Sequence, residues 1–360
     1  LKGARCSNIF IYGKTGTGKT AVTKYVLNKL SQKATEFGSP VKVCYINCRL
    51  AGTEYRVFSN MCDAVNVSIP FTGIALGEVF DRFKNGLDAR KLMLVTVLDE
   101  IDALVKDRGD ILLYELTRIN ETLRGSKTTV VGISNDLRFK ELLDPRVLSS
   151  LSEEEIVFQP YKADELLDIL SERAKLAFND EMLLEGALSL CAALAAAEHG
   201  DARRALDLLR VAGELAERER AKNVNEEHIR LAEKRIEHDR VFEAIKNLPS
   251  HSKSVLFSVY LLSKTGVRRI VTGEIYEIYC ELCEQIGMSP LTQRRVSDLI
   301  NELDSLGLLN TQVVSMGRYG RTKKIRLSIP SSLFKNVFID DDRFSRLLCY
   351  SPKHLTTVSK

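Results

Sequence analysis

Apolar and polar positions alternate in a regular order over the first 160 residues of the chain. Short runs of apolar or β-branched residues are separated by longer stretches in which apolar residues recur at helical spacing. The short runs cover residues 9–12, 41–47, 92–98, 128–133 and 155–158. Strands that alternate with helices predict an α/β domain over residues 1–160, in which a parallel five-stranded sheet has helices on both faces.

The stretch between the second and third runs is longer than a single crossover helix requires. It contains two amphipathic patterns, at residues 55–65 and 75–86. We therefore expect a helical insertion over about residues 52–86 of the α/β domain.

A second pattern begins at residue 161, where strand signals end and Ala, Leu, Glu and Arg dominate. Four helices are predicted there, over residues 163–178, 181–198, 201–221 and 225–240. The sequence therefore predicts an all-α domain over residues 161–240.

A third pattern covers residues 241–330 and combines helices with a hairpin. The predicted elements are helices at 256–264, 272–286 and 292–306 and strands at 309–315 and 323–328. Thr272 is expected to cap the second helix, Gly307 to end the third, and residues 317–320 to turn the hairpin. Three helices and a hairpin are typical of a winged helix-turn-helix, and we expect residues 331–360 to form a C-terminal tail.

Composition narrows the class of protein only a little. The 360 residues are 44% apolar and 28% charged, with a net charge of +4, and no run of about twenty apolar residues could span a membrane. Eight irregularly spaced cysteines in a chain of this size indicate reduced thiols, so we expect a cytoplasmic protein. Cys280 and Cys283 form a C-x-x-C pair without a second pair at zinc spacing, and two thiols on a helix explain them better than a metal site. The chain begins with Leu1 and shows no signal-peptide pattern, and we expect the gene product to start earlier.

The segment from Gly13 to Thr20 carries the strongest chemical signal. It reads GKTGTGKT and fits G-x-x-x-x-G-K-[ST] between an apolar run and a helical pattern at 21–30, a context that favours a nucleotide site over a Gly-rich turn. Its glycines allow backbone N–H groups to surround a phosphate, Lys19 is suited to the β- and γ-phosphates, and Thr20 is suited to Mg²⁺. The residues expected to bind ATP or ADP are Gly13, Thr15, Gly16, Thr17, Gly18, Lys19, Thr20 and Ala21.

Polar side chains follow two further predicted strands. Asp99 and Glu100 come directly after the run 92–98, at the edge where α/β sheets bind ligands. Asp99 is suited to hold Mg²⁺ and Glu100 to polarise the attacking water, although an acidic helix start would also explain the pair. Asn135 follows the run 128–133 and is suited to orient that water or contact the γ-phosphate, although taken alone an Asn that opens a turn explains it better.

These elements in this order resemble the AAA+ ATPases. In that class a helical lid follows the α/β domain, and GDARRAL at residues 200–206 resembles the sensor-2 motif of the lid. The resemblance implies that Arg203 contacts the γ-phosphate. An exposed Arg in a surface ion pair is the alternative.

The finer resemblance is to the archaeal origin-recognition/cell-division-control replication initiators, and it covers nearly the whole chain. It rests on SNIFIYGKTGTGKTAV at 7–22, VVGISNDLRFKELLDPRVLSSL at 130–151, FQPYKADELLDIL at 158–170 and the lid motif through residue 209. The resemblance implies that Tyr161 and Arg173 help to hold the nucleotide, whereas a core aromatic and a surface cation are the simpler explanations. Clamp loaders, the nearest competing family, have Ser-Arg where this chain has Ser149 and Ser150. That difference argues against a clamp loader and leaves Arg146 as the nearest candidate for an arginine finger acting on a neighbouring subunit.

Basic residues gather on two predicted elements of the third region. The helix at 292–306 opens with Gln293, Arg294 and Arg295, the positions that meet base edges in a helix-turn-helix. The hairpin adds the cations Arg318, Arg321, Lys323, Lys324 and Arg326. A solvated basic face would explain any one of them, but their clustering favours contacts with bases and phosphates. In the resembling family the insertion also touches DNA, an assignment that rests on the resemblance alone.

Taken with the resemblance, these features predict a DNA replication initiator that is a weak ATPase and uses ATP or ADP with Mg²⁺ as a conformational switch. The resemblance implies double-stranded origin DNA and the minichromosome maintenance helicase as partners, with a paralogous initiator or self-association on DNA, no membrane and a nucleoid location. One alternative is a signalling ATPase that regulates transcription through the winged helix. Another is a housekeeping ATPase whose winged helix binds protein.

Overall fold

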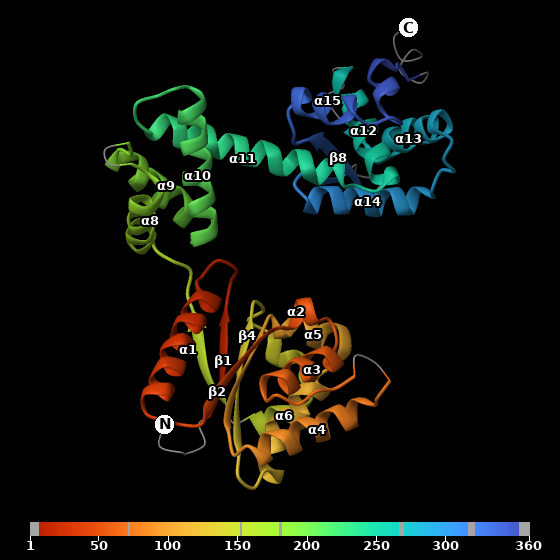
Figure 1. The fold of residues 1–360 in the computed structure, drawn as a ribbon. Helices are drawn as coiled ribbons and strands as arrows, with labels where there is room; N and C mark the ends of the chain where they lie inside the picture. Colours follow the sequence, from red (N-terminus) through yellow and green to blue (C-terminus); the bar gives the residue numbers. More distant parts are fainter. Residues whose placement is uncertain are drawn as a thin grey trace. The chain divides into compact units, whose positions relative to one another are not determined.

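A five-stranded parallel sheet organises the first part of the chain, as predicted (Figure 1). Its strands are β1 (Asn8–Gly13), β2 (Val41–Asn47), β3 (Met93–Asp99), β4 (Lys127–Ser134) and β5 (Glu153–Phe158). The strand order is β2-β3-β4-β1-β5, and every neighbouring pair is parallel. The carboxyl ends of β1, β4 and β3 are therefore neighbours, and these strands lead into the three segments for which nucleotide chemistry is predicted.

The structure is a computed structural model that describes residues 7–70, 73–151, 153–179, 182–265, 270–315 and 321–352. The chain forms two units, residues 1–229 and residues 230–360, and each is described by itself.

Helices cover both faces of the sheet. On one face, α1 (Lys19–Glu36) packs with Leu27 against β1, β3 and β4. The other face packs against the helices that follow β2, β3 and β4 (Figure 1). These helices are α2 (Cys48–Ala51), α3 (Glu54–Ala64), α4 (Leu76–Ala89), α5 (Ile101–Arg108), α6 (Ile111–Thr122), the 3₁₀ turn η1 (Phe139–Leu142) and α7 (Pro145–Leu151). The predicted insertion helices are α3 and α4, whose buried Phe58 and Phe83 join this larger core.

The second helical group begins directly after β5. It contains α8 (Ala163–Ala177), α9 (Glu185–Glu198), α10 (Ala202–Arg218) and α11 (Glu226–Lys246), in the order predicted. Leu166 and Leu170 of α8 are fully buried, as are small residues of α9 and α10, so the three helices pack closely. Asp201 starts α10, because its side chain accepts hydrogen bonds from the backbone N–H groups of Arg203 and Arg204.

The second unit contains a winged helix-turn-helix. Its elements are α12 (Ser250–Lys264), β6 (Ile270–Val271), α13 (Thr272–Ile286), α14 (Gln293–Ser305), β7 (Leu309–Ser315) and β8 (Arg321–Leu327), and the antiparallel sheet has the order β6-β8-β7. Thr292 caps α14 by accepting a hydrogen bond from the Arg295 N–H group. The prediction that Thr272 caps α13 was wrong. Val271 is the capping residue, and its N–H donates to the Glu274 carboxylate at 3.2 Å.

The expected C-terminal tail from residue 331 was also wrong over much of its length. Residues 331–349 contain α15 (Ser331–Ile339) and the 3₁₀ turn η3 (Ser345–Cys349). The ring of Phe334 stacks on Tyr260 of α12 with centroids 3.9 Å apart, and Phe338 and Phe344 pack around Phe257. These aromatic side chains belong to the core of the second unit, because leaving them in water would forgo their burial.

Neither a membrane span nor a metal cluster is found in the described residues. In that part of the chain no helix is long and apolar enough to cross a membrane. The same residues contain no group of three or more His, Cys, Asp or Glu side chains that could hold a metal ion, and Cys280 and Cys283 lie on α13 as free thiols.

Candidate nucleotide site

The loop between β1 and α1 has the backbone that the sequence motif requires. Gly16 and Gly18 have φ angles of +75° and +86°, a left-handed conformation that side chains disfavour. The Lys19 side chain is buried, and its Nζ donates to the carbonyls of Gly13 at 2.8 Å and Lys14 at 2.6 Å. Thr17 is buried as well, and its hydroxyl donates to the same Lys14 carbonyl. The loop is thus curled around its own lysine at the start of α1.

Burial also affects the protonation of that lysine. It lowers the pKa of Lys19, the negative charge of Asp99 opposes this effect, and the positive charge of Arg203 adds to it. A phosphate bound at the start of α1 would favour the charged ammonium over the neutral amine.

Asp99 lies at the end of β3 and is the most heavily hydrogen-bonded carboxylate near the loop. Its Oδ2 accepts from the Thr20 hydroxyl at 2.9 Å and from the Tyr45 hydroxyl at 2.5 Å, and its Oδ1 accepts from the Glu100 N–H group at 3.0 Å. Asp99 is 4% exposed. Burial, and then the hydrogen bond to Asp99, raise the pKa of Tyr45, so the phenol stays protonated and acts as a donor. The predicted pairing of Thr20 with Asp99 is therefore present, and Tyr45 joins it.

The two polar residues beside Asp99 are held by backbone geometry. Glu100 has a φ of +55°, which is uncommon for a residue with a side chain and indicates local strain. The N–H group of Asn135, just past β4, donates to Asp102 Oδ1 at 3.3 Å. Asp102 thus links the segment after β3 to the segment after β4. Both predicted residues lie at the carboxyl edge of the sheet.

The helical domain contacts the loop directly. The N–H group of Ala202, at the start of α10, donates to the Gly16 carbonyl at 3.1 Å. A Cβ atom on Gly16 would lie 1.7 Å from Asp201 Oδ1, and one on Gly18 would lie 2.3 Å from the Tyr161 hydroxyl. Both glycines are therefore required by the close approach of the helical domain as well as by their backbone angles.

These contacts enclose a cavity of about 330 Å³ between the loop, the sheet edge and the helical domain. Its lining includes the predicted residues Thr15, Gly16, Gly18, Lys19, Thr20, Ala21, Asp99, Glu100, Asn135, Tyr161, Arg173 and Arg203. Gly13 and Thr17 lie behind the lining, where they support the loop. A cavity this size with phosphate-binding backbone, two acids and two arginines has the features of a nucleotide site.

Three lining residues, Ile169, Ala202 and Leu206, were not predicted from the sequence. Ile169 lies four residues before Arg173 on α8, and Leu206 lies three residues after Arg203 on α10. Helical spacing places each apolar residue on the same face as its arginine, and this signal was available in the sequence.

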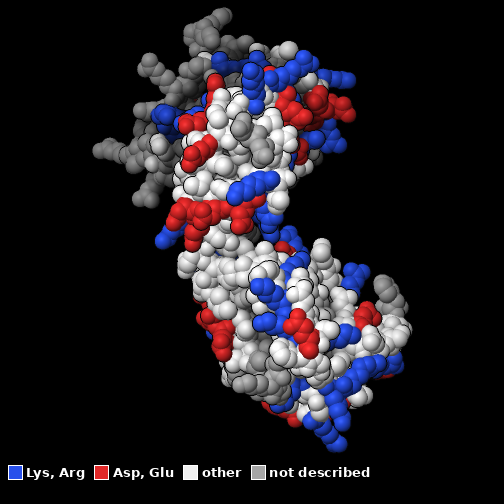
Figure 2. All heavy atoms as spheres, turned by 60° about the vertical axis from the view of Figure 1, so that its left-hand side comes forward, with Lys and Arg blue, Asp and Glu red and all other residues white. Residues whose placement is uncertain are grey.

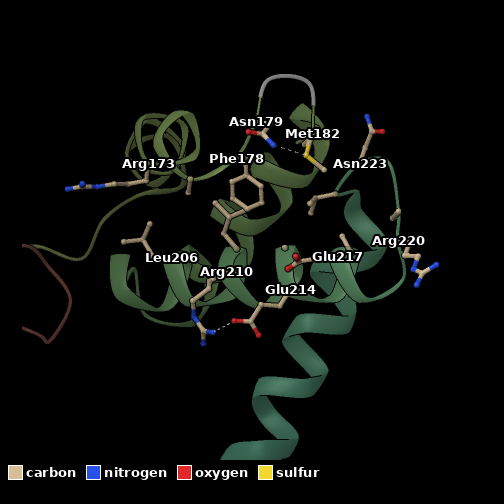
Figure 3. A pocket seen from close by; sticks show the side chains of 16 residues that line it. Arg173, Phe178, Asn179, Met182, Leu206, Arg210, Glu214, Glu217, Arg220 and Asn223 are labelled. Carbon is tan, nitrogen blue, oxygen red and sulfur yellow. Dashed lines mark hydrogen bonds and ion pairs between the residues drawn. The ribbon is translucent and has the colours of Figure 1, made fainter.

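A larger cavity of about 630 Å³ lies in the helical domain, beside α10 (Figure 3). Phe178 points into its middle, whereas Arg173 extends away from Phe178. Arg173 and Leu206 line both cavities. Because the larger cavity lacks loop residues and the acids of the sheet edge, the smaller one is the candidate nucleotide site.

The cations predicted to contact DNA lie on the surface of the second unit. Gln293, Arg294 and Arg295 are exposed in the first turn of α14. Arg295 faces acids of its own helix, Glu302 at 3.5 Å and Asp298 at 4.0 Å. Among the described residues, Arg294 has no ion pair.

The wing is described only in part. The Lys323 ammonium on β8 donates to the Asn301 side chain of α14, which joins the two elements. Arg318 lies outside the described residues, and of Arg321 only the backbone, in β8, is described. On the face drawn in Figure 2, Lys and Arg lie interspersed with Asp and Glu. Overall charge therefore does not mark a DNA surface on that face. The case for DNA binding rests on the residues of α14 and β8.

Arg146, the candidate arginine finger, is 79% exposed at the start of α7. Its guanidinium forms two hydrogen bonds with the neighbouring Asp144 carboxylate, at 3.0 and 3.1 Å. The side chain is accessible to another molecule, and its role as a finger stays a prediction.

Comparison with family models places all three parts of the chain. An AAA domain matches residues 3–138, a Cdc6 AAA+ ATPase-type lid domain matches residues 167–234, and a CDC6 C-terminal winged helix domain matches residues 243–337. The fold and the site thus define an AAA+ ATPase with a lid and a winged helix, as the sequence predicted.

Relatives of known class agree with this assignment. The chain is 53% identical to an ORC1-type DNA replication protein of Pyrococcus abyssi, over 98% of this chain and 85% of the relative. It is 51% identical to ORC1-type DNA replication protein 1 of Methanosarcina acetivorans, over 97% and 84% of the two chains. The chain belongs to the ORC1-type DNA replication proteins.

Solved structures share the fold. The structure of the Aeropyrum pernix ORC1 protein in complex with DNA is similar with a TM-score of 0.76 and 49% identity, over 96% of this chain and 89% of that one. The ADP form of the Aeropyrum pernix ORC2 protein, at 22% identity and a TM-score of 0.57, shares the fold alone, over 97% and 90% of the two chains.

Proposed function

We propose that the protein is an ATP-dependent initiator that binds double-stranded origin DNA and helps to load the minichromosome maintenance helicase. The observation that carries the nucleotide part is the hydrogen bond between Ala202 of the lid and Gly16 of the phosphate loop. Because lid and loop share one cavity, a phosphate on the loop would also meet Arg203 and Tyr161 of the lid. ATP and ADP differ in the γ-phosphate, and they would therefore favour different positions of the lid.

The residues of the cavity divide into clear tasks. The loop N–H groups and Lys19 would bind the β- and γ-phosphates. Thr20 and Asp99, which already lie within 2.9 Å of each other, fit a Mg²⁺ site of oxygen ligands. Bound Mg²⁺ would neutralise charge on the phosphates and so ease loss of the γ-phosphate.

Catalysis and sensing would fall to the polar residues around that site. Glu100 would take the proton of the attacking water, and Asn135 would orient the water. Arg203 would contact the γ-phosphate from the lid. Arg173 and Tyr161 would hold the nucleotide beside Leu206. We propose slow turnover, because a conformational switch requires one hydrolysis event per cycle.

DNA binding is proposed for the winged helix. The solved ORC1 structure at 49% identity is a complex with DNA, which supports this proposal. The exposed Gln293, Arg294 and Arg295 at the start of α14 support it as well. Lys323 and the wing residues Arg318 and Arg321 would lie along phosphates. Such binding would place the protein on the nucleoid.

Chromosome-wide mapping of binding sites tests the proposed function most directly. We expect occupancy at replication origins and co-purification of the helicase. Enrichment at promoters without the helicase would instead support the transcription regulator. In solution, the protein should prefer origin duplex to random duplex at matched physiological salt, and equal affinity for both would contradict the proposal.

Charge reversal separates DNA binding from protein binding by the winged helix. Arg294, Arg295, Arg318 and Arg321 changed together to Glu should abolish origin binding while ATP binding by the cavity stays intact. If this variant still supports initiation, the winged helix binds protein and the DNA assignment fails.

A further inference from the structure

Tyr45 lies on β2, a strand that carries none of the nucleotide-site residues expected from the sequence. In the parallel register, Tyr45 pairs with Val97, and Asn47 pairs with Asp99. Tyr45 and Val97 both belong to the small core on the α1 face of the sheet. Because side chains two residues apart on a strand share a face, Tyr45, Val97 and Asp99 face the same side. The tyrosine hydroxyl can therefore reach toward the end of β3, where Asp99 lies.

The hydroxyl of Tyr45 and the hydroxyl of Thr20 donate to the same atom, Asp99 Oδ2, at 2.5 and 2.9 Å. The second oxygen, Oδ1, is held by the Glu100 N–H group. Both oxygens of this nearly buried carboxylate therefore have donors, and the carboxylate has little freedom to rotate. Within the described residues, Tyr45 and Thr20 are its only side-chain donors.

The two side-chain donors, Thr20 and Tyr45, differ in their other binding partners. Under the proposed function, the oxygen of Thr20 is a ligand of Mg²⁺, and its position then depends on the metal. Tyr45 has no other hydrogen-bond partner among the described residues, so its hydroxyl is committed to Asp99. It is the donor that can fix the carboxylate before and after the metal binds.

We propose that Tyr45 is a positioning residue for the magnesium site: its hydroxyl holds the Asp99 carboxylate in the orientation that binds the metal or its water shell. The inference rests on the proposed nucleotide function and adds a residue to it. Outer-shell partners of this kind typically change metal affinity by 10- to 100-fold when removed.

The ring of Tyr45 is held independently of its hydroxyl. Lys24 Nζ lies 4.4 Å from the ring centre, and the ring packs in the core that contains Leu27 and Val97. Replacing Tyr45 with Phe should therefore remove the hydrogen bond and leave the packing in place. Tyr25 offers a matched control, because it is 58% exposed on α1 and has Lys29 Nζ 4.5 Å from its ring centre.

The experiment measures binding of a fluorescent ADP analogue to the full chain while Mg²⁺ is titrated, and again with EDTA. For Tyr45→Phe we expect the half-saturating Mg²⁺ concentration to rise about tenfold, with affinity in EDTA and the melting temperature unchanged. Tyr25→Phe should match the wild type in all three measurements. Asp99→Asn should raise the half-saturating Mg²⁺ concentration strongly. Adding Tyr45→Phe to Asp99→Asn should cause no further rise, because both changes act through one carboxylate.

The possible outcomes distinguish failure of the proposed role of Tyr45 from failure of the magnesium site itself. If the wild type shows magnesium dependence and Tyr45→Phe matches it, the positioning role is overturned and the magnesium site stands. If Tyr45→Phe loses ADP affinity equally in EDTA, its role is structural and the proposal is overturned. If the wild type binds ADP without any magnesium dependence, the magnesium assignment itself fails and this inference fails with it.

Discussion

The nucleotide cavity of the first unit and the exposed first turn of α14 in the second unit hold their functional side chains in opposite ways. In the cavity, Asp99 has three donors and Lys19 is buried with two acceptors. On α14, Gln293 and Arg294 are exposed, and the Arg295 guanidinium pairs with Asp298 and Glu302 of its own helix. The side chains of the cavity are therefore positioned by folding, whereas those at the start of α14 become ordered only when a partner binds.

This difference predicts different sensitivities. Removing one side chain in the cavity leaves its buried hydrogen-bond partners unsatisfied. Single substitutions there should therefore have large effects on nucleotide binding. Exposed cations act through charge and reach, and each contributes a small share that salt screens. Substitutions that reverse this order of effects would break the comparison.

The largest effect is expected from Lys19→Ala. The variant removes the charged donor that would meet the β- and γ-phosphates. Hydrogen bonds to charged groups contribute about 1.5–3 kcal/mol, so nucleotide affinity should fall by up to roughly 100-fold. Isothermal titration with ATP and with ADP measures the loss. Lys14→Ala is the matched control, because Lys14 is exposed and takes part in the loop through its carbonyl, and it should bind normally. Full affinity in Lys19→Ala would refute the assignment of the loop.

A second prediction concerns the fold of the second unit. Lys253 of α12 donates to Asp341, which follows α15, at 2.8 Å, and both side chains are largely buried. Burial opposes ionisation of Asp341, but the hydrogen bonds from Lys253 and from the Arg343 N–H group outweigh it and hold the pKa of Asp341 below its usual value. Asp341→Asn should therefore reduce stability by about 2 kcal/mol near neutral pH, the size of a hydrogen bond between charged groups, because it leaves a largely buried ammonium without a charged partner.

The sign of the pH dependence follows from the lowered pKa. The stabilisation by Asp341 is complete above the pKa of an unfolded Asp, about 3.9, and is lost as the pH falls through the lower folded value. The gap between wild type and Asp341→Asn should thus be constant from neutral to mildly acidic pH and close below pH of about 4. Native-state hydrogen exchange of α12 and α15 in the full chain measures it. Asp342→Asn, at an exposed neighbour, should have no effect, and equal losses in both variants would contradict the ion-pair argument.

The sequence predicted the parts of the cavity that are contiguous in the chain. The loop residues and the Asp99–Glu100 pair form short motifs whose spacing carries the chemistry, and the predicted run 41–47 has the same bounds as β2. The roles of Tyr161, Arg173 and Arg203 came from family resemblance, and the structure places all three in the cavity lining.

The parts that were missed depend on contacts between distant segments. Tyr45 reaches Asp99 only because β2 pairs with β3. In the sequence, Tyr45 is an ordinary residue of a predicted strand, and no motif indicates this contact. The two-residue strand β6 is too short for any periodicity. The helix α15 did carry a signal, since Leu333, Phe334, Val337 and Phe338 recur at helical spacing after Pro330, and the expected tail overlooked it.

The third prediction tests whether the lid depends on the loop glycine. Gly16→Ala introduces a Cβ atom at a position 1.7 Å from Asp201 Oδ1, at a residue with a φ of +75°. The backbone strain should cost about 1–2 kcal/mol, and the clash should displace the start of α10. Nucleotide affinity should fall about tenfold, as expected if a lid contact of about 1.4 kcal/mol is lost.

Gly38→Ala separates strain from the clash. Gly38 has a φ of +60°, and among the described residues no atom beyond its two chain neighbours lies within 4 Å of the added Cβ, so the variant carries the strain alone. It should lower the melting temperature as Gly16→Ala does while keeping normal nucleotide affinity. If both variants bind nucleotide alike, contact between lid and loop contributes nothing to binding, and the cavity would have to act without the lid.

The smallest effects are expected on α14, where two neighbouring arginines differ in their surroundings. Arg294 has no ion pair among the described residues, whereas Arg295 would have to leave Glu302 and Asp298 to reach DNA. Arg294→Gln and Arg295→Gln remove the same charge, so the long-range attraction to DNA falls equally in both. Any difference in origin affinity therefore reports direct contact.

We expect Arg294→Gln to cost about 1 kcal/mol of origin-binding free energy, roughly a fivefold loss of affinity, and Arg295→Gln about half of that free energy. Fluorescence anisotropy over a salt series measures both, and each variant that loses a phosphate contact should also lower the salt slope by about one. A larger loss of origin affinity in Arg295→Gln would mean that Arg295 leaves Asp298 and Glu302 when DNA binds. The ion pairs of the DNA-free protein would then not determine which arginine contacts DNA.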